Sequence, residues 1–320
     1  RCKRIYLCFV IYNIHLYVYL VFFLNNFLKY SKMYTKKHCS PFKKSLSYSC
    51  LDEKLLQEIR KGLNNIKGIK INSKLKGKKL HTEISKIMKN KFKCDNEACW
   101  LNIRKLMSNL SGKSAKLVKD HFRPMMPKEI VEHYSNWLSN FDIDKVLEQY
   151  HNDLPEFHYY GAVPIDFRKC SVSNLCNFNL SDHINRGEHK IGIVFNTDES
   201  HEDGKHWISM YADINGLNLN GQPGIYYFDS FGNAPPQEVK DLIDIFHDHG
   251  KKHDKKFVVT TNDRSHQKNN FSCGFYCMHF LENMIKGKQF EHYINDSLND
   301  KKMIEYRNHC FLHPKEIKTR

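Results

Sequence analysis

The sequence predicts a protein of mixed helices and strands, of the α+β class, with α/β as the alternative. Three observations support this prediction. Short runs of β-forming residues recur in the second half of the chain, segments with helical apolar spacing lie before and between them, and the N-terminal third carries helical patterns alone. The strand-like runs are residues 191–196, 206–212, 225–229 and 257–261. The helical patterns are residues 51–63, 82–91, 97–110, 127–138, 142–150 and 236–249, with a last helix that begins near Cys273.

The early helices are predicted from spacing and charge. Residues 51–63 carry acidic residues in the first turn and basic residues in the last, which suits a helix. Four apolar residues recur there near helical spacing: Leu51, Leu55, Ile59 and Leu63. A stretch rich in Lys, Gly and Asn, residues 61–79, predicts a loop. The predicted helix 127–138 should place four residues on one face: Ile130, Tyr134, Trp137 and Leu138.

Charge divides the chain into unequal parts. The net charge of +15 is the balance of +5 in residues 1–32, +15 in residues 33–120 and −5 in residues 121–320. Such asymmetry suggests separate functional units. We therefore predict a basic helical unit over 33–120 and a mildly acidic domain over 121–320. The basic unit could bind nucleic acid through its phosphates, or could be a solvated lysine-rich surface or linker.

The first 32 residues differ from the rest in composition. Residues 5–24 are almost wholly apolar and follow three basic residues, which is typical of a transmembrane helix or a signal anchor. The first methionine is Met33, and the composition changes abruptly there. We expect residues 1–32 to come from upstream translation or a wrong start. A membrane contact is expected only if 5–24 is a genuine segment of the protein.

The cysteines give no metal motif. The chain has eleven of them, and they lie far apart except for pairs such as Cys94 with Cys99 and Cys170 with Cys176. No tandem C-x-x-C pairs with zinc spacing and no H-E-x-x-H motif are present in the sequence. We therefore expect reduced, intracellular cysteines, and we predict neither a metal nor a cofactor.

The segment from Gln267 to Leu281 is the most informative for chemistry. A polar, asparagine-rich loop leads into an apolar helix, with Cys273 and Gly274 at the junction. A helix N-terminus favours the thiolate form of a cysteine, which is the nucleophilic form. Glycine next to it would let a substrate backbone approach closely. Taken alone, this pattern is more typical of a buried structural cysteine at a helix start.

A cysteine nucleophile needs a base and a group that orients the base. His206 and Trp207 open one strand-like run directly after a polar loop, and Asp229 with Ser230 closes the next one. Both pairs therefore lie at strand ends, where loops present side chains to one cleft. Either residue alone would be an ordinary surface histidine or turn aspartate.

The ordered set of these residues resembles the ubiquitin-like-protein protease clan. This clan includes SUMO proteases, adenovirus protease and the core-protein proteases of large DNA viruses, of the African swine fever virus and giant-virus type. The resemblance implies a papain-like fold variant with a small central mixed sheet flanked by helices. It implies that Cys273 is the nucleophile, His206 the base and Asp229 its orienting partner. It also implies that Gln267, six residues before Cys273, is the oxyanion donor, and that Trp207 narrows the cleft for small substrate residues.

The chain also departs from the pattern of the clan. Ser272 precedes the nucleophile where SUMO proteases usually have Asp, and Asp229 stands where the swine fever type has Asn. Asn233, four residues after Asp229, is a less favoured orienting residue. The loop 215–224 resembles a hairpin insertion that could contact substrate.

The sequence thus predicts a cysteine endopeptidase that cleaves after small sites of the Gly-Gly-X type, in viral structural polyproteins during virion maturation. The alternative within the clan is removal of a ubiquitin-like modifier from its conjugates. The alternative of another class is a non-catalytic scaffold or nucleic-acid-binding protein that uses residues 33–120. The resemblance places the protein in the virion or in the host cytoplasm at the assembly site, an intracellular and reducing location.

Overall fold

The computed structural model describes residues 38–43 and 45–317. The predictions for residues 1–32, including the apolar run 5–24, lie outside this range. Among the residues that the structure describes, no helix has both the length and the apolar character needed to cross a membrane.

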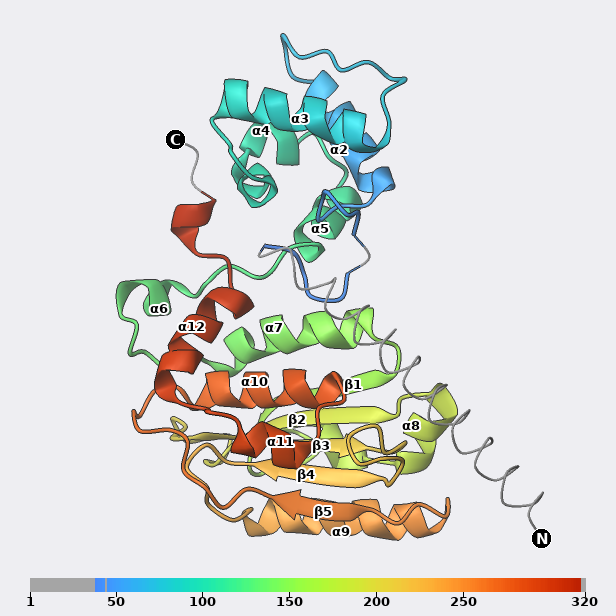
Figure 1. Cartoon of the computed structure of the whole chain (residues 1–320), viewed down its shortest axis with the longest axis vertical. Helices are drawn as coiled ribbons and strands as arrows, with labels where there is room; N and C mark the ends of the chain where they lie inside the picture. Colours follow the sequence, from blue (N-terminus) through green and yellow to red (C-terminus); the bar gives the residue numbers. More distant parts are fainter. Residues whose placement is uncertain (1–37, 44, 318–320) are drawn as a thin grey trace, which may run out of the picture. The chain divides into compact units, whose positions relative to one another are not determined.

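A five-stranded mixed sheet forms the centre of the larger part (Figure 1). Its strands are β1 (Phe157–Pro164), β2 (Lys190–Asn196), β3 (Trp207–Asp213), β4 (Gly224–Phe228) and β5 (Val258–Thr261), in that spatial order. The outer pairs β1–β2 and β4–β5 are parallel, and the inner pairs are antiparallel. This arrangement confirms the α+β prediction, and four strands lie within two residues of their predicted positions.

Strand β1 was not predicted, and its backbone explains why. Gly161 adopts φ of +99°, and the pairing with β2 shifts register between Tyr159 and Ala162. A positive φ suits glycine, and the resulting bulge interrupts the alternation of apolar and polar residues. The sequence pattern therefore does not look like a strand.

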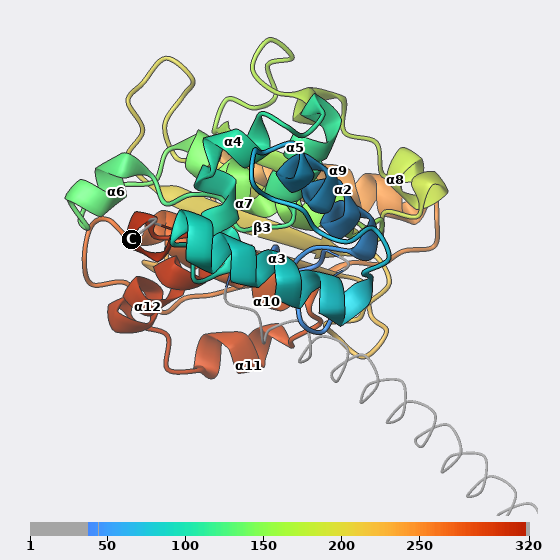
Figure 2. The same cartoon turned by 90° about the horizontal axis from the view of Figure 1, so that it is seen from above.

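Helices cover both faces of the sheet (Figures 1 and 2). α10 (Cys273–Ile285) packs on β3 and β2 on one face, and α7 (Asn140–Asp153) packs against β1. On the other face, α8 (Leu180–Arg186) and α9 (Gln237–Lys251) contribute to a cluster with inward side chains of β2 and β3. Strands buried on both faces are continuously apolar, as the runs in β2 and β3 are. The remaining helical segments near the C-terminus are α11 (Phe290–Asn295), α12 (Asp300–Cys310) and η3 (Pro314–Glu316).

The basic N-terminal part is a group of helices with its own apolar cluster (Figure 1). Its elements are α2 (Glu53–Asn64), α3 (Gly77–Phe92), η1 (Glu97–Asn102), α4 (Arg104–Met107) and α5 (Gly112–Asp120). Asp52 caps α2 by accepting the amide N–H of Leu55 at 2.8 Å, which confirms the helix predicted at 51–63. The described residues, 38–43 and 45–317, group as one compact unit. The domain boundary at residue 120 therefore stays a prediction.

The structure differs from the expectation of reduced cysteines at six positions. Disulfides join Cys39 to Cys50, Cys94 to Cys99 and Cys170 to Cys176. Their Cα atoms lie 5.1, 5.6 and 5.2 Å apart, inside the range that a disulfide requires. The sequence alone could not show this, because bonding depends on where folding brings the cysteine Cβ atoms.

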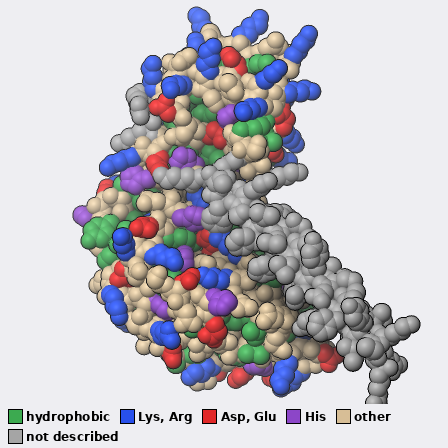
Figure 3. All heavy atoms as spheres, in the orientation of Figure 1, with side chains coloured by type: hydrophobic (Ala, Val, Ile, Leu, Met, Phe, Trp, Pro, Cys, Tyr) green, Lys and Arg blue, Asp and Glu red, His purple; other side chains and the backbone are tan. Residues whose placement is uncertain are grey.

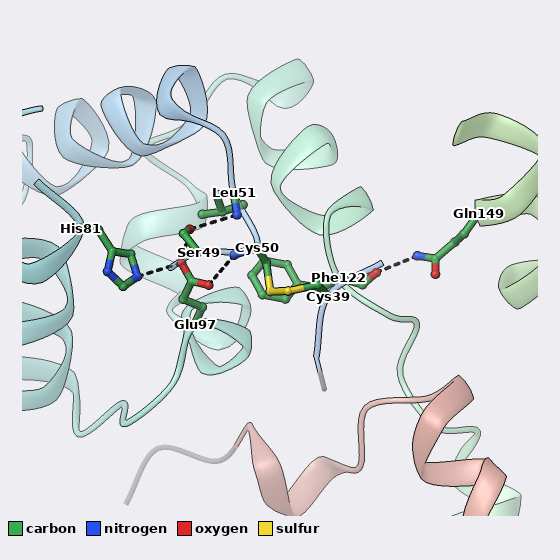
Figure 4. The surroundings of a disulfide bond; sticks show 8 residues. All are labelled: Cys39, Ser49, Cys50, Leu51, His81, Glu97, Phe122 and Gln149. Carbon is green, nitrogen blue, oxygen red and sulfur yellow. Dashed lines mark hydrogen bonds and ion pairs between the residues drawn. A yellow bond between two sulfur atoms is a disulfide. The ribbon is translucent and has the colours of Figure 1, made fainter. Parts of the chain in front are cut away.

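Glu97 lies beside the Cys39–Cys50 disulfide (Figure 4). Its carboxylate accepts the backbone N–H of Cys50 at 2.7 Å and the Ser49 hydroxyl, and it lies 3.0 Å from Nε2 of His81. On the other side, the Gln149 amide of α7 donates to the Phe122 carbonyl at 2.7 Å. These hydrogen bonds link the N-terminal helices to the segments around them.

The helix predicted over 127–138 is mostly wrong. Only α6 (Lys128–Glu132) is helical there. The Glu129 carbonyl accepts the His133 backbone N–H at 2.9 Å, which is the last helical hydrogen bond, and it also accepts the Asn136 side-chain amide at 3.1 Å. His133 is extended, with φ of −135° and ψ of 103°, so the helix ends there. Tyr134 and Trp137 are 65% and 42% exposed instead of sharing a buried face with Ile130.

The predicted loop 61–79 is shorter than expected, because its two ends are helical. α2 continues to Asn64, and α3 begins at Gly77. The loop itself spans residues 65–76, and its side chains include four exposed lysines: Lys67, Lys70, Lys74 and Lys76.

Candidate active site

The candidate site lies at one end of the sheet, where β2 and β4 end and β3 begins. His206 directly precedes β3, and Asp229 directly follows β4. These neighbouring strands are antiparallel, with Ser209 opposite Phe228, so the start of one meets the end of the other. The sheet therefore brings the two predicted residues together.

His206 and Asp229 form a hydrogen-bonded pair. Nε2 of His206 lies 2.7 Å from Oδ1 of Asp229. Burial alone would lower the pKa of His206, but its hydrogen bonds with Asp229 and Cys273 raise that pKa to about 9. Burial would raise the pKa of Asp229, but the hydrogen bond with His206 and the attraction of that ring lower it. The pair thus favours a charged imidazolium next to a charged carboxylate.

Asp229 is fixed by further hydrogen bonds. Its Oδ1 accepts the Phe231 N–H at 2.9 Å, and its Oδ2 accepts the Asn233 side-chain amide at 2.8 Å. Asn233 was the less favoured orienting residue, and the structure places its side chain behind Asp229. Asn262 holds the Asp229 backbone from both sides, accepting its N–H at 2.9 Å and donating to its carbonyl at 2.7 Å.

Cys273 is the first residue of α10 and is buried. The Cys273 thiol is one of the groups that raise the pKa of His206, so the two side chains lie close to each other. Since Nε2 of His206 faces Asp229, Nδ1 is the nitrogen that remains for the sulfur. The turn before the helix is built by Asn269, whose Oδ1 accepts the N–H groups of Phe271 and Ser272, both at 3.0 Å. The backbone N–H of Cys273 lies at the helix start, where it has no partner within the helix.

Gln267 is buried next to Ser230. Its Oε1 accepts the Ser230 hydroxyl at 2.7 Å, and its Nε2 donates to the Asn269 carbonyl at 2.7 Å. A side-chain amide has two N–H donors, so one N–H of Gln267 remains for another acceptor. The Gln267 and His266 backbone N–H groups both donate to the Ser230 carbonyl, at 3.0 and 2.8 Å. The Gln267 loop is therefore attached to the end of β4.

Trp207 and Gly274 were predicted to contact substrate. The Trp207 indole N–H donates to the Leu138 carbonyl at 3.1 Å, and its side chain is mostly buried. A Cβ atom on Gly274 would lie 3.3 Å from both Leu138 Cδ1 and Ile143 Cδ1. Close packing of α10 against Leu138 and Ile143 therefore explains why residue 274 is glycine. Substrate contact by Trp207 or Gly274 stays a prediction.

The loop 215–224 does not lie near these residues. It follows Asp213 at the far end of β3, about 20 Å along the strand from His206 at 3.3 Å per residue. Its Asn218 amide donates to the carbonyls of Met284 and Lys288, both at 2.8 Å. The loop thus packs on the end of α10, away from His206, and its contact with substrate stays a prediction.

Sequence reasoning missed two contributors to the site besides Asn262. Ser230 fixes the orientation of the Gln267 amide, and Phe231 packs on His206 with ring centroids 4.8 Å apart. Phe231 is 38% exposed. Both residues directly follow Asp229 in the sequence, so proximity to that candidate was the available signal.

A cysteine at a helix start, a paired histidine and carboxylate, and a nearby amide donor are the parts that acyl transfer through a thioester requires. Together with the sheet and its helices, they define a cysteine protease. The profile of the family described as "Ulp1 protease family, C-terminal catalytic domain" matches residues 193–320. A thiol protease of Acanthamoeba polyphaga mimivirus is 30% identical over 220 residues, covering 68% of this chain and 70% of that protease. The chain therefore belongs to the Ulp1 protease family.

Two further comparisons agree with this assignment. A cysteine protease of African swine fever virus (isolate Tick/Malawi/Lil 20-1/1983) is 25% identical over 258 residues, covering 73% of this chain and 89% of the relative. The crystal structure of an African swine fever virus protease superposes with a TM-score of 0.62 at 21% identity, covering 88% of this chain and 98% of that one. The fold likeness confirms the predicted protease architecture.

Proposed function

We propose that Cys273, His206, Asp229 and Gln267 perform peptide hydrolysis in the roles that the sequence motifs predict. The observation that supports this most is the position of His206. One ring nitrogen lies 2.7 Å from the Asp229 carboxylate, and the Cys273 thiol is close enough to raise the pKa of the ring. A base held between a carboxylate and a thiol is the arrangement that nucleophilic catalysis needs.

The proposed reaction begins with transfer of the Cys273 proton to His206. The thiolate attacks the scissile carbonyl carbon, and the remaining N–H of Gln267 and the backbone N–H of Cys273 stabilise the oxyanion. Such a donor contributes on the order of 3 kcal/mol to transition-state stabilisation. The His206 imidazolium then protonates the leaving amine, and water hydrolyses the thioester. Asp229 keeps the ring oriented and stabilises its charge.

Replacement of the nucleophile tests this mechanism. Cys273→Ala should abolish cleavage of peptide substrates, and an active-site-directed thiol reagent should modify Cys273 of the parent protein selectively, as peptide mapping can show. Cys310→Ala on α12 is the matched control, because Cys310 is another buried free cysteine and should be dispensable for turnover. Cleavage retained by Cys273→Ala, or a parent protein in which the reagent modifies other cysteines in preference to Cys273, would contradict the mechanism.

For the substrate, we propose cleavage after small residues, in sites of the Gly-Gly-X type within viral structural polyproteins. Two observations support this. The relatives described above are proteases of large DNA viruses. The Trp207 indole next to His206 is held by the Leu138 carbonyl, and a fixed indole beside the base would leave little room for larger side chains. Such an enzyme would act in the virion or at the assembly site in the host cytoplasm.

The second candidate substrate is a conjugate of a ubiquitin-like modifier. One relative in African swine fever virus carries the name SUMO-1 cysteine protease, and modifier tails also end in Gly-Gly. Parallel assays of a modifier conjugate and of short Gly-Gly-X peptides should separate the two candidates. We expect a higher kcat/KM for the peptides than for the modifier conjugate. Preference for the folded modifier would favour deconjugation instead.

We also propose that the N-terminal helices bind nucleic acid through lysine-phosphate contacts. Exposed lysines gather along the loop 65–76 and the start of α3, and Lys or Arg side chains project from this part of the surface (Figure 3). Replacing Lys67, Lys70 and Lys74 with Gln should weaken binding to duplex DNA and flatten its dependence on salt. The same changes at Lys240, Lys255 and Lys256 of the catalytic part serve as the control. Binding that does not weaken as salt rises would contradict the proposal.

A further inference from the structure

Three side chains from separate elements converge at the end of the sheet away from Cys273. His158 is the second residue of β1, His183 lies on α8, and Glu188 lies in the segment before β2. Nδ1 of His183 is 2.6 Å and Nδ1 of His158 is 3.2 Å from Oε2 of Glu188. One nitrogen or oxygen atom from each of the three residues lies within 4.8 Å of the others.

We propose that His158, His183 and Glu188 bind a divalent transition-metal ion of the zinc type, with water as the remaining ligand. Two imidazoles and a carboxylate form a zinc ligand set, and zinc lies about 2.0–2.2 Å from such atoms. Ligand atoms around a tetrahedral ion at that distance are about 3.3 Å apart. The His158–Glu188 separation already matches this value, and the His183–Glu188 pair would have to open by less than 1 Å.

An unpaired buried nitrogen points to a missing ligand. Nδ1 of His158 is buried and makes no hydrogen bond in the described structure, although it faces the Glu188 carboxylate. An unpartnered buried polar atom is costly. A metal ion between His158 and Glu188 would satisfy this nitrogen.

The surroundings of His183 fit a metal ligand as well. The side chain is 1% exposed, and its Nε2 lies 2.7 Å from the Tyr160 hydroxyl. Metal-bound histidines commonly donate their second ring N–H to such a partner, which fixes the orientation of the ring. Burial lowers the pKa of His158 to about 4 and also lowers the pKa of His183.

Arg186 and His151 lie next to the three proposed ligands, but neither is a ligand itself. The Arg186 guanidinium donates to Oε2 of Glu188 at 2.8 Å and lies 3.3 Å from Nδ1 of His183. Its side chain is 51% exposed, so it can turn into solvent when an ion binds. His151 packs on His158 with ring centroids 5.0 Å apart, but its Nδ1 accepts the Tyr159 N–H at 3.2 Å. His151 is therefore a neighbour and not a ligand.

The ion would connect the start of β1, the helix α8 and the entry into β2. Its role would be structural, because the site lies at the opposite end of β2 from the residues next to His206. No spacing motif in the sequence reveals this site, since the ligands belong to three elements that only the fold brings together.

Zinc titration of the Cys273→Ala protein tests the proposal. This background removes the thiol of the catalytic residues, which could itself bind zinc. Native mass spectrometry and equilibrium dialysis with Zn²⁺ should show one tightly bound ion, and the ion should raise the thermal midpoint. Glu188→Gln, which keeps the size of the side chain, should abolish this ion and the thermal shift. Tyr160→Phe should weaken binding about 10-fold through loss of the second hydrogen bond.

His151→Ala is the matched control, because it removes an adjacent histidine and should keep both the ion and the thermal shift. If Glu188→Gln fails to fold, the Tyr160→Phe variant still decides the question. Equal zinc content in Glu188→Gln and its parent would overturn the proposal, as would loss of the ion in His151→Ala alone or no bound ion in the parent.

Discussion

His206 and Asp229 lie 23 residues apart in the sequence, yet Nε2 of His206 is 2.7 Å from Oδ1 of Asp229. The pair forms because antiparallel strands β3 and β4 begin and end at the same edge of the sheet. With Nε2 used in this way, Nδ1 is left to face Cys273. The hydrogen bond thus determines which nitrogen can exchange a proton with the thiol.

We predict that Asp229→Asn shifts the alkaline limb of the pH profile of kcat/KM to lower pH. The parent His206 has a pKa raised to about 9, so its imidazolium persists until pH rises through that value. The neutral amide removes the negative charge that favours the imidazolium, so the proton is lost at lower pH. Activity measured across a pH series should show this shift, together with a loss of about 10-fold or more near neutral pH.

Asp198→Asn is the control for this prediction. Asp198 lies in the loop before His206 and pairs with Lys205 at 3.2 Å, so its charge is nearby without contacting His206 directly. The alkaline limb of the pH profile of kcat/KM in Asp198→Asn should lie at the same pH as in the parent protein. An unchanged limb in Asp229→Asn would show that Asp229 does not set the protonation of His206.

The sequence indicated the catalytic candidates because their chemistry depends on local context. Cys273 stands where a polar loop enters an apolar helix, and His206 and Asp229 stand at strand ends. The supporting residues could not be found in this way. Asn262 acts through its position next to the Asp229 backbone, 33 residues away in sequence, and only tertiary structure creates that contact.

The errors in the predicted elements have equally local causes. Residues 133–138 continue an apolar pattern, but the backbone becomes extended at His133 and ends the helix, and Tyr134 and Trp137 are exposed. Strand β1 contains a bulge next to Gly161. In both places, a single side-chain or backbone feature overrides the periodicity on which sequence prediction depends.

We predict that Ser230→Ala lowers kcat about 10-fold with little effect on KM. The buried Ser230 hydroxyl donates to Oε1 of Gln267 at 2.7 Å and so fixes which end of the amide faces the site. Without it, the amide can flip and present its oxygen where a donor is needed. Steady-state kinetics on a peptide substrate measures the effect.

Ser209→Ala is the matched control for Ser230→Ala. Ser209 is also a buried serine, on β3, and its hydroxyl lies 3.5 Å from the Phe228 carbonyl rather than near Gln267. It should leave kcat nearly unchanged. A change in KM alone for Ser230→Ala would argue that Gln267 contributes to substrate binding and not to oxyanion stabilisation.

We predict that Gly274→Ala destabilises the fold by about 1–3 kcal/mol, the usual cost of overpacking. Its Cβ would lie 3.3 Å from the Leu138 and Ile143 side chains. Gly112→Ala in α5 is the control, because a Cβ there would meet no atom within 4 Å. Denaturant unfolding measures both free energies. Equal stability of the two variants would mean that α10 has room at Gly274.

Finally, we predict that Asp300 positions the loop that carries Gln267, the proposed oxyanion donor. Its Oδ2 accepts the backbone N–H groups of Lys268 and Asn269 at 3.0 and 2.8 Å, and its Oδ1 accepts the Tyr276 hydroxyl at 3.1 Å. Asp300→Ala should release the segment next to Gln267 and lower kcat by about 10- to 100-fold, since each hydrogen bond to a charged group contributes about 1.5–3 kcal/mol.

Asp300→Asn separates the hydrogen bonds that this carboxylate accepts from the effect of its negative charge. The amide keeps one acceptor oxygen and removes the charge. It should recover part of the lost kcat. Glu305→Gln, an exposed position on the same helix, should behave as the parent does. Kinetics should be measured well below the thermal midpoint of each variant, so that a fall in kcat reflects the loop and not unfolding. If Asp300→Ala unfolds at lower temperature but keeps the parent kcat, Asp300 supports the fold alone and does not position Gln267.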